Sequence, residues 1–285
     1  MADTLAAARR REVRREASRQ VLRALGRSLL TFGLTLVVVL VLWTGAIELF
    51  GISSYVAKGP TDVWAYLVTD DDAGEHVARL RDDLGVSLVH AFTGFVAGLV
   101  VALLGATAFR LSRGVEHALM PIAMLLRSVP LVAMAPVLLL IFGQGRLGVA
   151  TIGAIVVLFP ALVNIVLGLR SASPLALDLV KVNGGGELKA LLLVRVPSAL
   201  PAFFASVRIS VPGAIVGAML AEWLSGFTGL GGILNAYKGR GNFSGVWAIV
   251  VVSVVTSIVG YAVAAVVEAA ALAAWGPDAG KSARR

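Results

Sequence analysis

Three charged residues inside long apolar stretches are the side chains best placed to do chemistry in this sequence. Arg127, Glu222 and Glu268 stand where an unpaired charge costs about 2.5–3.5 kcal/mol on membrane-insertion scales. Cysteine is absent, so neither a thiolate nucleophile nor a disulfide framework is available. The three histidines are scattered, unlike the clustered donors of a metal site, and we expect interface roles for them: His76, His90 and His117.

Arg127 lies about nine residues into the third apolar stretch, next to Pro130. A proline bends a helix there and releases backbone carbonyls. Two interpretations follow. Arg127 and Pro130 line a translocation path in which the cation attracts an anionic solute, or Arg127 bonds the freed carbonyls or Glu222.

Glu222 lies near the end of the fifth apolar stretch, four residues before Gly226 and just ahead of a Gly229-Leu230-Gly231 turn. We expect it to accept hydrogen bonds from the turn's amides or to face the cavity of a translocation path. The glycines lack a neighbouring lysine, so a phosphate cradle is not predicted. Glu268, near the end of the sixth stretch, is expected to be an interfacial anchor with Trp275.

The composition places all these residues in a polytopic membrane protein. Hydrophobic residues make up 58% of the chain and charged residues 15%, and the mean hydropathy is +0.88. A membrane-spanning helix needs about 20 apolar residues. Unbroken runs of this length favour helices over the alternating strands of a barrel, so the predicted fold class is all-α. Six such runs occur, approximately at residues 29–50, 84–109, 118–142, 147–169, 202–224 and 246–274.

The distribution of basic residues predicts the orientation. Residues 1–28 contain eight arginines and three acidic residues, whereas residues 51–83 contain three basic and seven acidic residues. The positive-inside rule therefore places the N-terminus in the cytoplasm, and six spans bring the tail 276–285 and the loop 170–201 to the same side. Arg146, Lys238 and Arg240 then fall in short outer loops. The predicted location is the bacterial inner membrane, with the spans in residues 29–275.

The N-terminal arginines alternate with apolar residues at every fourth position from Val13 to Leu25. This spacing predicts a surface amphipathic helix over residues 1–28 that leads into the first span. A nucleic-acid arm or a cleaved signal peptide fits less well.

A polar insertion from Pro174 to Pro201 interrupts the apolar pattern between the fourth and fifth stretches. A glycine between two short helices permits a sharp reversal, so a helix can protrude into a cleft of a soluble partner. We expect Asp178, Gly184 and Glu187 at that contact. Gly185 and Gly186 make the turn flexible, while Pro197 and Pro201 set the angle into the fifth span. The chain has no phosphate-binding P-loop sequence, so any ATP must be bound elsewhere.

The insertion resembles the cytoplasmic loop of binding-protein-dependent ABC importer permeases, because Gly184, Pro197, Leu200 and Pro201 stand at the family's positions. Asp178-Leu179-Val180 departs from the family's Glu-Ala-Ala triplet. The strings RSVPLVAMAPVLLLIFGQG (Arg127–Gly145) and AEWLSGFTGLGGIL (Ala221–Leu234) are similar to the sulfonate, taurine and nitrate permease group.

The resemblance implies a type I importer permease that is not itself an enzyme and binds no cofactor or metal. It also implies a second permease copy or paralogue, two ATP-binding subunits that hold ATP and magnesium, and an external solute-binding protein. The expected cargo is a small anionic solute. Two alternatives stay open: a self-contained secondary transporter or channel, and a membrane scaffold without transport.

Overall fold

The computed structural model describes residues 30–226 and 228–274, except for the side chain of Arg127. The predictions for residues 1–28 and for the tail 276–285 fall outside this part. The chain divides into two compact units, Met1–Ala65 and Tyr66–Arg285, and each is described by itself.

The first unit contains an apolar helix, Leu30–Leu49, and the short helix α2 (Pro60–Trp64). Pro60 occupies the first turn of α2. Amides in the first turn make no hydrogen bond within the helix, so the missing amide proton of proline costs nothing there. Asp62 accepts a hydrogen bond from the amide of Gly59 at 2.8 Å, which fixes the start of the helix.

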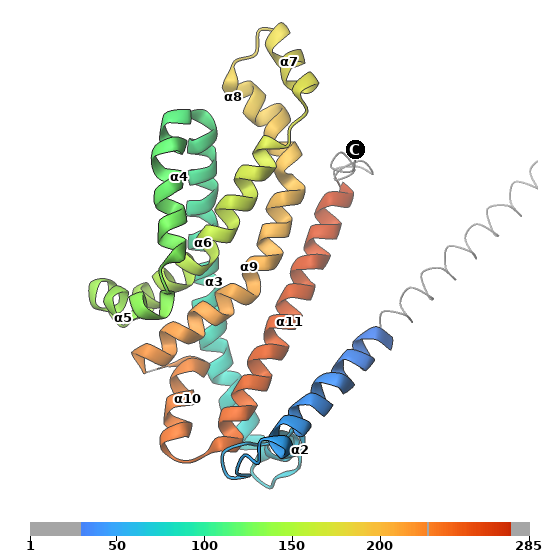
Figure 1. The fold of residues 1–285 in the computed structure, drawn as a ribbon, viewed down its shortest axis with the longest axis vertical. Coiled ribbons are helices and arrows are strands. Elements are labelled where there is room, and N and C mark those ends of the chain that lie inside the picture. The colour runs from blue at the N-terminus through green and yellow to red at the C-terminus, as the bar shows by residue number, and fades with distance from the viewer. Residues whose placement is uncertain (1–29, 227, 275–285) are drawn as a thin grey trace, which may run out of the picture. The chain divides into compact units, whose positions relative to one another are not determined.

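The second unit is built from helices alone in the residues that the structure describes (Figure 1). The π-helical turn η1 (Ala65–Thr69) begins at the last residue of the first unit and continues into the second. Its helices, in chain order, are α3 (Ala73–Leu111), α4 (Arg113–Ser128), α5 (Leu131–Phe142), α6 (Arg146–Arg170), α7 (Pro174–Val182), α8 (Glu187–Ala190), the π-helical η2 (Leu191–Arg195), α9 (Val196–Ser225), α10 (Gly229–Gly239) and α11 (Phe243–Ala274). Within this unit, the α7–α8 hairpin lies at one end and α10 at the other (Figure 1).

Helices α3, α6 and α9 form the centre of this unit through close contacts between small residues. A Cβ atom on Gly98 of α3 would lie 2.5 Å from the carbonyl oxygen of Ala154 in α6. A Cβ atom on Gly217 of α9 would lie 3.1 Å from the Cα of Gly153. Small residues let backbones approach in apolar surroundings, where packing replaces the hydrophobic effect between helices.

Among the described residues, five helices are long and apolar enough to cross a membrane, or six if one bent pair counts as a span. That pair is α4 and α5, whose axes differ by 106°. The expected third span is therefore two helices joined at Val129 and Pro130. Val129 has extended backbone angles, as expected for a residue before proline, and Pro130 is the N-cap of α5.

Two expected boundaries move in the structure. Helix α3 begins at Ala73, so residues 73–83 continue the second span as helix, with Leu80 buried, and are not a loop. The fifth span begins before Ala202, because α8, η2 and α9 form one apolar helix from Glu187 to Ser225. Pro197 lies in the first turn of α9 and Pro201 lies inside it. The π-helical turn η2 ends two residues before Pro197, whose missing amide proton favours such an irregularity.

Candidate functional site

The α7–α8 hairpin is fixed by a glycine turn at the end of α7. The amide of Gly185 donates to the carbonyl of Val180 at 2.8 Å, and that of Gly184 donates to the carbonyl of Lys181 at 2.9 Å. These two bonds form a Schellman motif, which needs the left-handed backbone found at Gly184 (φ +72°). A Cβ atom on Gly185 would lie 2.4 Å from Val180 Cγ1. The two glycines are therefore required for different reasons, one for conformation and one for space.

Gly186 is the N-cap of α8, and its carbonyl accepts a hydrogen bond from Ala190 at 3.0 Å. The triple glycine thus ends one helix and starts the next. Its hydrogen bonds form a defined turn between the two helices.

Helix α7 exposes an apolar face. None of its residues is buried. Leu175, Leu179 and Val182 are 80%, 64% and 86% exposed. They stand at positions i, i+4 and i+7, which share one side of a helix. Asp178 lies next to this face and is also exposed.

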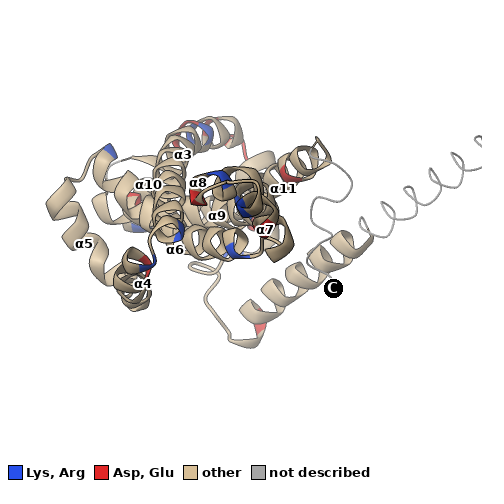
Figure 2. Ribbon diagram, turned by 90° about the horizontal axis from the view of Figure 1, so that it is seen from above, with Lys and Arg blue, Asp and Glu red and all other residues tan. Residues whose placement is uncertain are grey.

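One ion pair from the hairpin and one buried arginine in the following η2 connect this region to the central helices. The carboxylate of Glu187 lies 3.8 Å from the guanidinium of Arg110 at the end of α3. Arg195 is buried and donates to the carbonyl of Leu169 in α6 at 3.3 Å. Figure 2 shows charged residues at the starts of α4 and α8 and none along α5. A displacement of the hairpin would therefore act directly on α3 and α6.

Glu222 is fully buried where α3, α9 and α10 meet. Its Oε1 lies 2.9 Å from Nδ1 of His90, and its Oε2 accepts from the hydroxyl of Ser87 at 2.7 Å and from the amide of Gly231 at 3.0 Å. Ser87 in turn accepts a hydrogen bond from the amide of Leu230 at 2.8 Å. Both carboxylate oxygens are thus occupied, which matches the expected bonds to the turn's amides.

Gly226 and Gly229 frame the same turn. Gly226 has φ +77° and caps α9, with its amide donating to the carbonyl of Glu222 at 2.8 Å. A Cβ atom on Gly229 would lie 2.5 Å from the carboxylate of Glu222. The glycines of this turn therefore make room for a buried carboxylate.

Arg208 is a functional candidate that the sequence reasoning missed. It lies within the fifth apolar stretch, and its guanidinium is 3.0 Å from the carboxylate of Glu268 in α11. Its Cζ also lies 5.4 Å from the ring centroid of Tyr261. Glu268 is thus the ion-pair partner of Arg208. Its expected anchor role involves Trp275, which is outside the described residues. The available signal was a further charge in an apolar stretch, opposite in sign to Glu268.

Arg127 and Pro130 lie at the break between α4 and α5. The partners found for Glu222 are on α3 and α10, so the proposed bond from Arg127 is not needed to satisfy it. The hairpin brings Asp178, Gly184 and Glu187 together, while Arg127 and Glu222 belong to separate parts of the unit.

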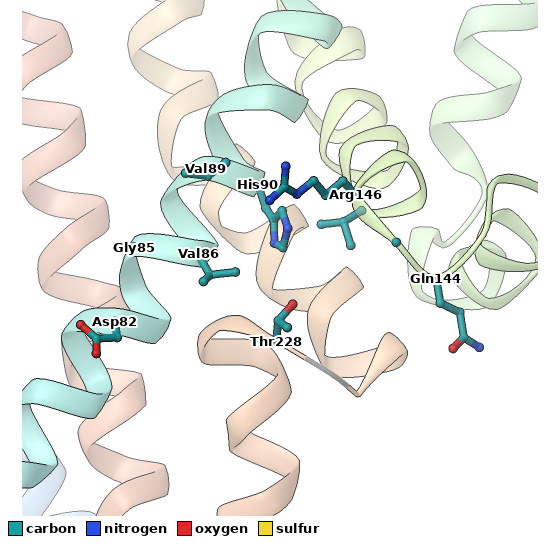
Figure 3. A pocket seen from close by; sticks show the side chains of 10 residues that line it. Asp82, Gly85, Val86, Val89, His90, Gln144, Arg146 and Thr228 are labelled. Atoms are coloured by element: carbon teal, nitrogen blue, oxygen red, sulfur yellow. The ribbon is translucent and has the colours of Figure 1, made fainter.

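A cavity of about 720 Å³ lies between α3, the start of α6 and the turn before α10. Figure 3 shows the side chain of Arg146 extending from α6 toward the His90 side of this cavity, with Thr228 at the turn and Asp82 farther along α3. Val86, Val89 and Val149 supply apolar wall. Glu222 does not line the cavity but holds His90, which does.

Tyr66 anchors a small polar cluster in η1. Its ring stacks on His76 with centroids 3.9 Å apart, and its hydroxyl lies 3.4 Å from Nδ2 of Asn242. Burial is the main reason that the pKa of Tyr66 is raised to about 12.

The structure combines apolar helices, a glycine-turned hairpin with an exposed apolar face, and buried polar contacts between helices. These features define a helical membrane transport component. The chain belongs to the family of binding-protein-dependent transport system inner membrane components, whose model matches residues 93–272. This family comprises transport permeases and not catalytic subunits, so the expected class and fold are confirmed. The family works with ATPase and binding-protein partners.

Individual relatives agree with this placement. The chain is 32% identical to a probable ABC transporter permease protein of Haemophilus influenzae, over 68% of this chain and 77% of that protein. It is 28% identical to the riboflavin transport system permease protein RibX of Chloroflexus aurantiacus, over 72% and 75%. It is 27% identical to the taurine transport system permease protein TauC of Escherichia coli, over 78% of each chain, which confirms the resemblance to the sulfonate, taurine and nitrate group.

The crystal structure of an amino acid ABC transporter with histidines has the same fold. The TM-score is 0.55 with 15% identity, and the match covers 71% of this chain and 97% of the other. At this identity the likeness describes the fold alone.

Proposed function

We propose that this chain forms the membrane path of an ATP-driven importer and that the α7–α8 hairpin is its contact with ATP-hydrolysing subunits. Two such subunits would bind ATP and magnesium. A second permease, identical or paralogous, would complete the path, and an external binding protein would deliver the solute. The N-terminus, the C-terminus and the hairpin would then face the cytoplasm of a bacterial cell.

The single observation that carries this proposal is the apolar face of α7. Leu175, Leu179 and Val182 are exposed at the tip of a hairpin whose backbone is fixed by hydrogen bonds. An apolar helix face presented on a rigid support is the form that enters a groove of a soluble partner. Asp178 lies at the edge of this face, and its charge would fix the position of α7 on the partner.

The contacts that this region makes with α3 and α6 explain how binding of a partner would move the path. Glu187 faces Arg110 on α3, and Arg195 binds the carbonyl of Leu169 on α6. A partner that prefers one position of the hairpin would therefore bias the positions of both central helices. Pro197 and Pro201 fall in the helix that carries this displacement into α9. Arg127 and Pro130 stay our candidates for the lining of the path, whereas we assign Glu222 to holding α3, α9 and α10 together.

The test compares two variants of α7 that each lower the net charge by one. Leu179→Glu places a charge on the apolar face, and Lys181→Gln removes one from the other side of the same helix. The tagged chain is extracted gently from its native membrane, and the proteins that co-purify are identified by mass spectrometry. We expect ATP-binding subunits with the unaltered chain and with Lys181→Gln, and a loss of at least tenfold with Leu179→Glu.

Equal recovery with both variants would contradict the assignment of this face. Recovery of the unaltered chain alone, in a form that transports solute without any ATPase, would replace the importer by a self-contained transporter. Membrane abundance of each variant, measured by immunoblot, separates lost contact from lost protein.

A further inference from the structure

We propose that the cavity between α3, α6 and the turn before α10 is a binding site for an organic monoanion with an apolar body. Arg146 would hold the anionic group, with the ring of His90 beside it. The inference rests on the proposed function for its statement that the occupant is cargo, but the site itself is tested by binding alone.

Arg146 is the cationic side chain of the cavity, and it lies beside His90 of another helix. Arg146 extends from the start of α6 toward the part of α3 that carries His90 (Figure 3). A guanidinium recognises carboxylates and sulfonates through paired hydrogen bonds. Among the described residues, no ion pair is formed by Arg146, so its charge is open to a solute.

The ring of His90 is held in a fixed orientation at this end of the cavity. Its Nδ1 is held 2.9 Å from the buried carboxylate of Glu222, which leaves Nε2 as the second polar atom of a ring that lines the cavity. A carboxylate on one ring nitrogen fixes the orientation of the imidazole. The hydrogen bonds of Glu222 with Ser87 and Gly231 therefore hold His90 in place without lining the cavity.

The volume of the cavity and the side chains of its wall indicate the class of solute. A cavity of about 720 Å³ lies within the range of about 300–1,000 Å³ that holds organic ligands and far exceeds the needs of a small inorganic ion. Val86, Val89 and Val149 offer apolar contact to the body of such a molecule.

Asp82 lines the other end of the cavity and would limit the charge of the occupant. It lies eight residues before His90 in α3, which is about 12 Å along a helix. Its carboxylate accepts from Arg81 at 3.3 Å, and both side chains are exposed. A second anionic group at this end would be repelled, whereas a hydrogen-bond donor would be accepted, so a monoanion fits better than a dianion.

The absence of cysteine makes a clean test available. Thr228→Cys places the chain's single thiol in the cavity wall, and Ala236→Cys places one on the exposed side of α10 outside the cavity. Each purified variant reacts with anionic sulfonatoethyl methanethiosulfonate and with cationic trimethylammonioethyl methanethiosulfonate. The ratio of the two rates reports the local charge.

Arg146→Gln is then added to both backgrounds. One unit charge at about 7 Å in water changes a rate about threefold, so the ratio of anionic to cationic rates at Cys-substituted Thr228 should fall about ninefold. The ratio at Cys-substituted Ala236 should stay within twofold. An unchanged ratio at Thr228 would overturn the role of Arg146.

Protection by solutes tests binding directly. Benzenesulfonate and benzoate at millimolar concentration should slow labelling at Thr228 at least threefold, and Arg146→Gln should remove this protection. Benzamide, the neutral analogue, and nitrate should give none. No protection by either organic anion, or equal protection by benzamide, would overturn the site. Neither result depends on ATPase subunits, so the importer assignment would stand or fall separately by the co-purification test.

Discussion

At the scale of single residues, partners offset the desolvation cost of the carboxylates that lie between helices. Glu222 has partners on both oxygens, and Glu268 faces Arg208. A buried charge that loses its partner is strongly destabilising, because the desolvation cost remains while the attraction is lost. Among the described residues, these two carboxylates lie at contacts between helices that are distant in sequence. Their first role is to fix the positions of helices relative to one another.

Glu222→Ala should lower the stability of the folded chain by about 3–5 kcal/mol. The change leaves the hydroxyl of Ser87, the ring of His90 and the amide of Gly231 without their buried partner. Glu222→Gln keeps an acceptor for two of these groups and should cost less than half as much. The midpoint of thermal unfolding in detergent measures both. Equal midpoints for the two variants would show that the hydrogen bonds of this carboxylate do not support the fold.

Tyr66 provides a prediction about pH. Its pKa is raised to about 12, above the value of about 10 for an unfolded tyrosine, so the folded state holds the proton longer. The stabilisation is fully present below pH of about 10 and is lost as the pH rises toward about 12. Unfolding midpoints measured across this window should fall more steeply for the unaltered chain than for Tyr66→Phe. Parallel curves would mean that Tyr66 does not ionise in this window on unfolding.

At the scale of elements, close packing of α3 on α6 depends on glycines that no larger residue can replace. A Cβ atom on Gly98 would lie 2.5 Å from a backbone oxygen of α6, whereas one on Gly74 of the same helix meets nothing within 4 Å. Gly98→Ala should therefore cost about 1–3 kcal/mol through overpacking. Gly74→Ala should be neutral or stabilising, since alanine favours the helix. Thermal midpoints of the two variants should differ in this direction, and equal midpoints would show that the interface yields without cost.

At the scale of the second unit, long helices join the hairpin to the polar contacts at the other end. Helix α3 runs without a break from Ala73 to Leu111, which is about 58 Å at 1.5 Å per residue. It meets Glu187 of the hairpin near one end and carries Ser87 and His90 in its other half. A partner that shifts the hairpin would thereby reach the cavity through one rigid element. Coupling of this kind needs two states that the partner binds unequally.

The sequence by itself determined the class of this protein, its all-helical fold and the position of its glycine turn. Long apolar runs dictate helices because lipid offers no partner to exposed backbone groups, and the order of the Arg127–Gly145 and Ala221–Leu234 strings indicates the family. These features depend on residues that are close together in the chain, so the sequence alone is enough to predict them.

Only the tertiary structure decided the partners of Glu222, the pairing of Arg208 with Glu268, the 106° break before α5 and the cavity beside Arg146. Ser87 and Glu222 are 135 residues apart, and no periodicity predicts which faces of α3 and α9 meet. That choice depends on small residues such as Gly98 and Gly217 fitting a facing helix. Contacts of this kind are a property of packing between helices, which the pattern within any one helix does not contain.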